Sequence, residues 1–198
     1  WPDYAERLKT LNDSGAAGRE PLRLLFGFTD SAAASLERMR QTISGPDLET
    51  AVEILAGAGT IYLVGQRRAY PVAAYLAYAF AKLNIRCALI DNVGSLAPEQ
   101  LAAAGPQDAL LAISFTPYTP ITIQLAQEAA RAQVPVIAIT DSVFSPLTPH
   151  ARAWLEVVEA DFGAFRSMAA TFSLAMALAV AVGERRSQAR ARTAAGAA

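Results

Sequence analysis

Residues 108–140 read DALLAISFTPYTPITIQLAQEAARAQVPVIAIT, and the order of apolar and polar residues in this stretch decides the fold class. Two short, continuous apolar runs, 109–113 and 136–139, are separated by a hydroxyl-rich loop and by a helical segment at 120–132. A strand that is apolar at every position has both faces covered, as in a parallel sheet between two layers of helices. The stretch therefore predicts a strand–helix–strand unit.

The same alternation continues on both sides of this unit. Further apolar runs lie at 61–64, 87–90 and 154–158, and Glu156 marks the last of these as an edge strand. The segments between and around the runs have helical patterns, at 29–43, from Pro46 to about Gly57, and at 71–83, 96–104 and 162–184. Repeated strand–helix units predict an α/β fold with a doubly wound, five-stranded parallel sheet and helices on both faces. One strand order of such a sheet is 2-1-3-4-5, and it is the order adopted here.

One domain is expected, over residues 29–184. Residues 1–28 have mixed charge and several turn residues, which predicts an N-terminal arm. Residues 185–198 combine arginines with small residues and are predicted to form a basic, flexible tail. The apolar stretch 167–183 is Ala-rich and too short for a membrane span, so it is interpreted as a buried helix.

The composition excludes several kinds of site. The net charge of −1 gives no overall basic field for nucleic acid, and a single cysteine, Cys87, excludes a disulfide framework and fits a reducing, cytoplasmic location. With one cysteine and one histidine, His150, no metal site is expected. The first strand is not followed by Gly-x-Gly-x-x-Gly, so neither a nicotinamide nor a flavin cofactor is expected.

Two loops are predicted to build a ligand site, because ligands bind beyond the carboxyl ends of the strands where the winding reverses. With the order 2-1-3-4-5 these are the loops after the first and third strands. The first loop offers a flexible exit and two guanidinium groups, and the second offers hydroxyls at the start of a helix, where anions bind well. The candidate ligand-binding residues are Gly65, Gln66, Arg67, Arg68, Ser114, Phe115, Thr116 and Thr119, with Asp161 and Arg166 at the rim.

Spacing alone leaves a simpler interpretation equally open. Thr119 and Pro120 suit the cap and first turn of a helix, so the second loop could be an ordinary capped connection. Arg67 and Arg68 could be solvated surface residues.

Several motifs resemble a SIS (sugar isomerase) domain of the RpiR family of bacterial transcriptional regulators, over roughly residues 29–184. Hydroxyls at 114, 116 and 119 match that family's Ser-x-Ser-Gly-x-Thr loop, and the segments 139–142 (ITDS), 145–147 (SPL) and 162–167 (FGAFRS) match later motifs. The chain departs from the family pattern at Arg67 and Ala69, which replace Gly and Ser, and at Pro117, which replaces Gly and removes an N–H donor.

The resemblance implies a non-enzymatic domain that binds a phosphosugar or a related anionic carbohydrate derivative. It also implies a homodimer or higher homo-oligomer whose ligand modulates DNA binding through an N-terminal helix-turn-helix domain. The 28 residues of the arm are too few for such a domain, so it is expected to be absent from this chain.

Two alternatives remain. Relatives with this fold isomerise aldose and ketose phosphates, for which His150, Glu99 and Glu159 would be the candidate acid–base residues. A dimerisation module whose ligand site has decayed is the other alternative, and it predicts an occluded pocket with Arg67 pointing to solvent.

Overall fold

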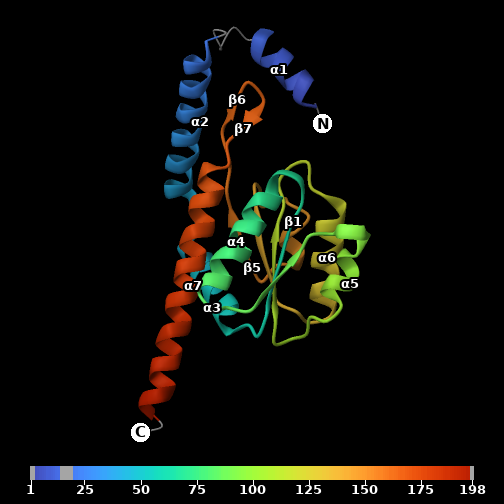
Figure 1. Ribbon diagram of the computed structural model, residues 1–198, viewed down its shortest axis with the longest axis vertical. Coiled ribbons are helices and arrows are strands. Elements are labelled where there is room, and N and C mark those ends of the chain that lie inside the picture. The colour runs from blue at the N-terminus through green and yellow to red at the C-terminus, as the bar shows by residue number, and fades with distance from the viewer. Residues whose placement is uncertain (1–2, 14–19, 197–198) are drawn as a thin grey trace.

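The computed structural model describes residues 3–13 and 20–196, and its centre is a five-stranded, all-parallel sheet (Figure 1). The strands are β1 (Ile61–Gly65), β2 (Cys87–Ile90), β3 (Ala109–Ile113), β4 (Val136–Thr140) and β5 (Ala153–Glu156). Their order is β2-β1-β3-β4-β5, and each neighbouring pair is parallel. The predicted fold class and strand order are therefore confirmed.

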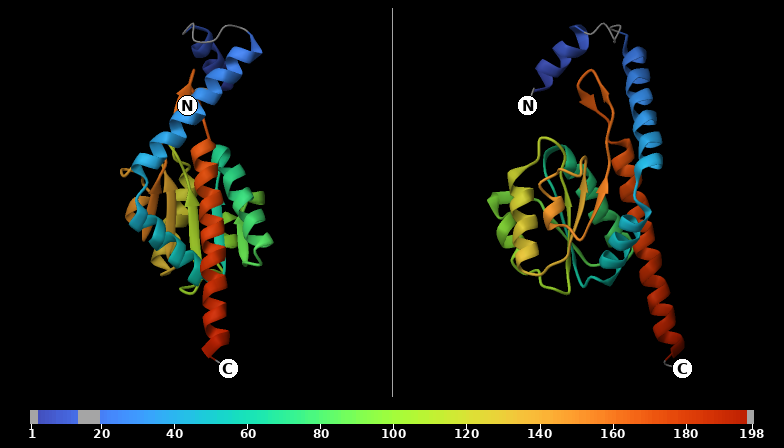
Figure 2. Two further views of the ribbon diagram at one scale, coloured as in Figure 1. Left: turned by 90° about the vertical axis from the view of Figure 1, so that its left-hand side faces the viewer. Right: turned by 180° about the vertical axis from the view of Figure 1, so that it is seen from behind.

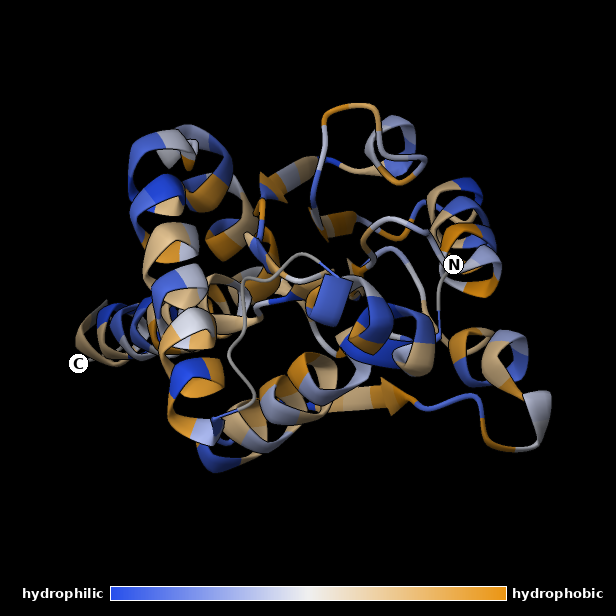
Figure 3. Ribbon diagram, turned by 90° about the horizontal axis from the view of Figure 1, so that it is seen from above, coloured by the Kyte–Doolittle hydropathy of each residue, from blue (hydrophilic) through white to orange (hydrophobic). Residues whose placement is uncertain are grey.

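Helices cover both faces of the sheet, as the continuous apolar strands require. The helices α3 (Gly45–Gly57), α4 (Tyr70–Lys82) and α7 (Ala169–Gly196) pack on one face, and α5 (Ala97–Leu101) and α6 (Pro120–Arg131) pack on the other. In β1, Ile61 and Leu63 belong to the first core while Tyr62 and Val64 belong to the second. Figure 3 shows hydrophobic and hydrophilic residues alternating along the covering helices, as expected for amphipathic elements.

The N-terminal part of the chain is helical. The helix α1 (Tyr4–Asp13) precedes α2 (Pro21–Thr42), which projects above the sheet beside a small antiparallel hairpin, β6 (Asp161–Phe162) and β7 (Phe165–Arg166) (Figures 1 and 2). The predicted arm, 1–28, thus contains α1 and the first turns of α2, which begins at Pro21 because proline suits a first helical turn. Residues 1, 2 and 14–19 of that arm lie outside the described residues.

Aromatic rings and hydroxyl groups hold these projecting elements together. Tyr4 of α1 and Phe28 of α2 both make edge-to-face contacts with Phe165, with ring centroids 5.2 and 6.1 Å apart. Ser31 donates to the Ala160 carbonyl oxygen at 2.9 Å, and the Ala160 amide donates to Ser35 Oγ at 2.9 Å. We call α1, α2 and the β6–β7 hairpin, joined by these contacts, the N-terminal clasp.

The last helix differs from the prediction at both ends. It begins at Ala169 rather than at residue 162, because residues 161–166 turn back on themselves as the hairpin. It continues to Gly196, so the segment predicted to be a flexible tail is helical over its described residues. Arg185 pairs with Glu49 and Glu53, and the Arg186 guanidinium donates to carbonyl oxygens at the end of α3. These bonds fasten the beginning of the predicted tail to α3.

Among the described residues, no helix is long and apolar enough to cross a membrane. The stretch 167–183, predicted to be a buried helix, is exposed at Met176 and Val180. The sole cysteine, Cys87, is half-buried in β2, and burial raises the pKa of its thiol.

Candidate functional site

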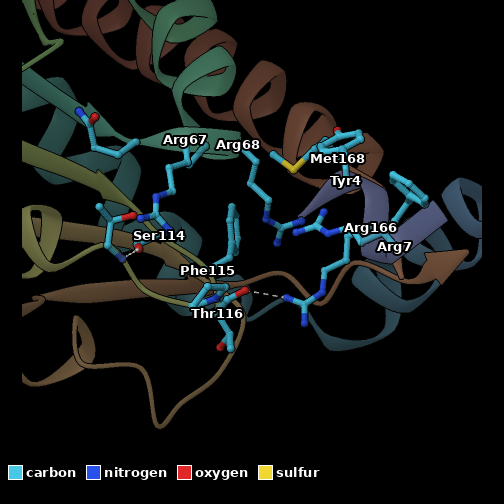
Figure 4. A pocket seen from close by; sticks show the side chains of 14 residues that line it. Tyr4, Arg7, Arg67, Arg68, Ser114, Phe115, Thr116, Arg166 and Met168 are labelled. Carbon is cyan, nitrogen blue, oxygen red and sulfur yellow. Dashed lines mark hydrogen bonds between the residues drawn. The ribbon is translucent and has the colours of Figure 1, made fainter. Parts of the chain in front are cut away.

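A pocket of about 310 Å³ opens at the carboxyl ends of β1 and β3, which are neighbours in the sheet (Figure 4). Gly65, the last residue of β1, is in register with Ile113, so the two loops leave the sheet side by side. Of the predicted ligand-binding residues, all but Gly65 line this pocket, and so does Arg166 from the predicted rim. The lining residues are Tyr4, Arg7, Gln66, Arg67, Arg68, Ala69, Ser114, Phe115, Thr116, Pro117, Thr119, Phe165, Arg166 and Met168.

The loop after β1 turns sharply into a short 3₁₀ helix, η1 (Arg67–Ala69). A Cβ on Gly65 would come within 2.9 Å of the Ala69 carbonyl oxygen, so only glycine allows this close turn. Arg67 adopts a left-handed φ of 55°, which is strained for a non-glycine residue and directs its side chain along the pocket. Gly65 therefore allows the close turn that places η1 at the pocket, although Gly65 itself does not line the pocket.

Arg68 is the most desolvated cation of the pocket. Its guanidinium carbon lies 4.9 Å from the centroid of the Phe115 ring, within cation–π distance. Its Nη1 is buried and has no hydrogen-bond partner among the described residues. Desolvation, followed by the nearby charge of Arg166, lowers the pKa of Arg68, although Asp141, Glu159 and Asp161 oppose the shift.

Several polar groups of the loop after β3, predicted to be available to a ligand, form hydrogen bonds within the protein. Ser114 is only 3% exposed, and its Oγ accepts a hydrogen bond from the Thr119 amide at 3.2 Å. Thr119 stands at the N-cap position of α6, but its side chain makes no capping hydrogen bond, contrary to expectation. The exposed Thr116 donates its amide to Asp141 Oδ2 at 3.0 Å. Two amides of this loop, those of Thr116 and Thr119, are therefore already engaged within the protein.

Arg166, on β7, ties the hairpin to the loop after β3. Its Nη1 donates to the Thr116 carbonyl oxygen at 2.9 Å and lies 3.6 Å from Asp141, while its Nε lies 3.3 Å from Asp161. The predicted rim residues Asp161 and Arg166 are therefore an ion pair, and only Arg166 reaches the pocket lining. This network fixes one wall of the pocket.

The sequence reasoning missed part of this wall. Tyr4 and Arg7 reach the pocket from α1, and Phe165 and Met168 reach it from the hairpin and the start of α7. Gly163, which lies between aromatic residues, is the one local signal for the hairpin. The two-residue turn has positive φ at both positions, 55° at Gly163 and 66° at Ala164, and such a turn favours glycine. No local pattern predicts that α1 folds back onto the pocket.

The charge of the lining is one-sided. Its charged residues are Arg7, Arg67, Arg68 and Arg166, and no Asp, Glu or His lines the pocket within the described part of the chain. No group of His, Cys, Asp and Glu that could hold a metal ion occurs there either. The lining is therefore chemically suited to an anion, with hydroxyl and amide groups beside it.

The candidate acid–base residues lie elsewhere. Glu99 is exposed on α5, and His150 is in the 3₁₀ helix η3 (Thr148–His150) that precedes β5. Glu159 is buried and does not line the pocket, and its Oε1 accepts hydrogen bonds from the amide and the hydroxyl of Thr171 at 2.8 and 2.7 Å.

Comparison with solved structures places this arrangement among known folds. The sugar isomerase domain of an RpiR transcription factor from Sphaerobacter thermophilus is 25% identical, with a TM-score of 0.77 over 83% of this chain and 91% of that one. Vibrio vulnificus NanR, solved with ManNAc-6P, is 20% identical with a TM-score of 0.70, over 94% and 75% of the two chains. Phosphoheptose isomerase GmhA from Neisseria gonorrhoeae is 15% identical with a TM-score of 0.65, over 83% and 97%. A search of curated protein sequences finds no match.

The fold, with its pocket at the point where the winding reverses, defines a doubly wound α/β domain of the sugar isomerase type. The SIS domain profile matches residues 54–181, so the chain belongs to the SIS domain family. The predicted resemblance is thereby confirmed. Both regulators and isomerases share this fold, so the fold alone does not assign a role to this chain.

Proposed function

We propose that this chain is the effector-binding domain of an RpiR-type transcriptional regulator and that its effector is a phosphosugar or a related anionic carbohydrate derivative. The effector binds in the pocket between the loops after β1 and β3. Its binding modulates DNA binding by a helix-turn-helix domain outside this chain.

One observation carries the proposal. The residues predicted from the two loops line a single open pocket, and its charged lining residues are all arginines. The pocket is open rather than occluded, and the exposed Arg67 contributes to its lining, which argues against the alternative of a decayed site. The similar Vibrio vulnificus NanR was solved with ManNAc-6P, which supports a phosphorylated sugar as the ligand class.

The direct test is a thermal-shift and calorimetric screen of sugar phosphates. A ligand present at about 100 times its Kd stabilises the folded state by about 2.7 kcal/mol, which raises the Tm of a protein of this size by about 5–11 °C. Ser114→Ala combined with Thr116→Ala should reduce this shift, because both residues line the pocket. Thr50→Ala, which removes an exposed hydroxyl on α3, is the matched control. The absence of stabilisation by any sugar phosphate, or the same shift in the Ser114/Thr116 variant, would refute the proposal.

Binding without catalysis is favoured by the position of the acid–base residues. Neither His150 nor Glu99 lines the pocket, and the buried Glu159 is held by Thr171. Proton exchange at C2 of a bound aldose phosphate in deuterated water distinguishes the two functions. We expect none, and exchange that disappears in Glu159→Gln would instead establish an isomerase.

We also propose that the domain works as a homo-oligomer. Large apolar side chains are exposed along the adjoining helices α4 and α7, namely Tyr78, Leu83, Met176 and Val180. Exposed large apolar side chains on two adjoining helices support a protein interface there. Light scattering should give at least twice the 20.9 kDa of the chain, and Val180→Glu should lower the mass while Gln188→Glu, on the same helix, should not. A monomeric wild-type chain would contradict this.

A further inference from the structure

The charged donors that line the pocket are all guanidinium groups, and several backbone donors of the second loop are occupied or missing. The Thr116 amide is bonded to Asp141, and the Thr119 amide is bonded to Ser114 Oγ. Positions 117 and 120 are prolines and have no N–H group. Arginine then supplies the strong, forked donors that a phosphate or carboxylate requires.

These guanidinium groups lie at two separate ends of the pocket. Figure 4 shows Arg67 pointing toward Ser114 at one end, while Arg68 points toward the side from which Arg7 and Arg166 enter. The ring of Phe115 stands between the two ends, under the guanidinium group of Arg68. A ligand that spans the pocket therefore meets one cationic group at each end.

The Arg68 end has an unused donor. Arg166 is neutralised by Asp141 and Asp161, at 3.6 and 3.3 Å. Arg68 forms no such ion pair, and its buried Nη1 has no hydrogen-bond partner among the described residues. A buried, unsatisfied guanidinium nitrogen destabilises the empty pocket, and an anion placed there would remove that cost.

We propose that the ligand carries two anionic groups and is a phosphorylated sugar acid, with its phosphate at the Arg67–Ser114 end and its carboxylate at the Arg68 end. This rests on the proposed function, since it concerns the same pocket. A neutral sugar with one phosphate would satisfy the Arg67–Ser114 end and leave Arg68 unpaired.

Two probes test the carboxylate separately from the phosphate. The compounds 6-phosphogluconate and sorbitol 6-phosphate are both open-chain, six-carbon phosphates, and they differ only by a carboxylate or a CH₂OH group at C1. We expect calorimetry to give about tenfold tighter binding of 6-phosphogluconate, the ratio that one charge-assisted hydrogen-bond pair provides. Gluconate, which lacks the phosphate, should bind more weakly than either.

Two variants test which arginine binds the carboxylate and which binds the phosphate. Arg68→Met should reduce the ratio of the two affinities to about one and change the Kd of sorbitol 6-phosphate by less than about threefold. Arg67→Met should weaken both phosphates by the same factor and keep the ratio. The Tm of each unliganded variant reports whether it is folded.

The outcomes separate this inference from the proposed function. Equal binding of the two phosphates by the wild-type protein, or an equal loss of both in Arg68→Met, would overturn the two-anion proposal and leave phosphosugar binding intact. If neither these compounds nor any sugar phosphate in the screen binds, the proposed function fails as well.

Discussion

Replacing Arg166 tests whether the N-terminal clasp is anchored through the loop after β3. Arg166→Met keeps the aliphatic part of the side chain and removes three polar contacts, to the Thr116 carbonyl, Asp141 and Asp161. The side chains of Arg166 and Asp141 are only 23% and 14% exposed, so this pair is shielded from water. Asp161 is 50% exposed and contributes little.

The magnitude follows from these contacts. A hydrogen bond from a charged donor contributes about 1.5–3 kcal/mol, and the exposed Asp161 pair contributes about 0–1 kcal/mol. Asp141 Oδ1 already lacks a partner, so the variant leaves this carboxylate with only the Thr116 amide at Oδ2. We expect the free energy of unfolding to fall by about 3 kcal/mol, which lowers the Tm by about 6–12 °C.

The assay is thermal and urea unfolding of a double-mutant cycle. Asp141→Asn removes the charge and can still accept the Thr116 amide, so the double variant should be less destabilised than the sum of the singles by about 1–2 kcal/mol. Arg131→Met, at the exposed end of α6, should change stability by less than about 0.5 kcal/mol. A Tm decrease of less than about 2 °C for Arg166→Met, or strict additivity in the cycle, would refute the reasoning.

Three further predictions concern other parts of the molecule. Arg186→Met should lower the free energy of unfolding by about 1–3 kcal/mol because it frees carbonyl oxygens at the end of α3. Arg185→Met should be less destabilising because its partners Glu49 and Glu53 are exposed, and urea unfolding that gave the reverse order would contradict this. In Gly163→Ala, the new Cβ would lie 2.1 Å from Leu11 Cδ1, so α1 should be released and cleaved faster in limited proteolysis, while unchanged cleavage would argue against this packing. Burial raises the pKa of the Cys87 thiol above its ordinary value of 9.0, so the folded state holds this proton more tightly than the unfolded state. The contribution of the thiol to the free energy of unfolding is complete below pH 9.0 and is lost as the pH rises through the folded-state pKa. Thermal unfolding of Cys87→Ala should therefore lose less stability than the wild-type protein from about pH 8 to about pH 10, and parallel curves would contradict the assignment.

The sheet could be predicted from sequence because each strand carries its own evidence. Ile61 to Val64 are apolar at every position, which only a strand covered on both faces tolerates, and the helices between such strands fix a parallel connection. The two loops followed from the topology alone, since ligands bind where the winding reverses. Given the strand order, Ser114 and Arg67 were expected near one another, although spacing alone left an ordinary capped loop equally open, and both line the pocket.

The rest of the site could not be predicted, because it depends on contacts between distant segments. Arg166 bonds a carbonyl 50 residues earlier, and Tyr4 packs on Phe165 from the other end of the chain. The positive φ of Ala164 gives no local signal, since alanine rarely adopts it. The helical structure beyond residue 184 could not be predicted for a similar reason, because it is fastened by arginines whose partners lie on α3.

The N-terminal clasp gives the pocket a physical connection to the beginning of the chain. Tyr4 packs its ring against Phe165, and Arg166, the next residue along β7, is bonded to the loop that presents Ser114 and Thr116. A ligand can shift an equilibrium only by the difference in its affinity for two states. An anion bound at Arg68 would also attract Arg7 of α1, which lines the same pocket, and would thereby favour the state in which α1 is docked. We therefore expect ligand binding to be coupled to the position of α1 through the charges of Arg68 and Arg7, without deformation of the sheet.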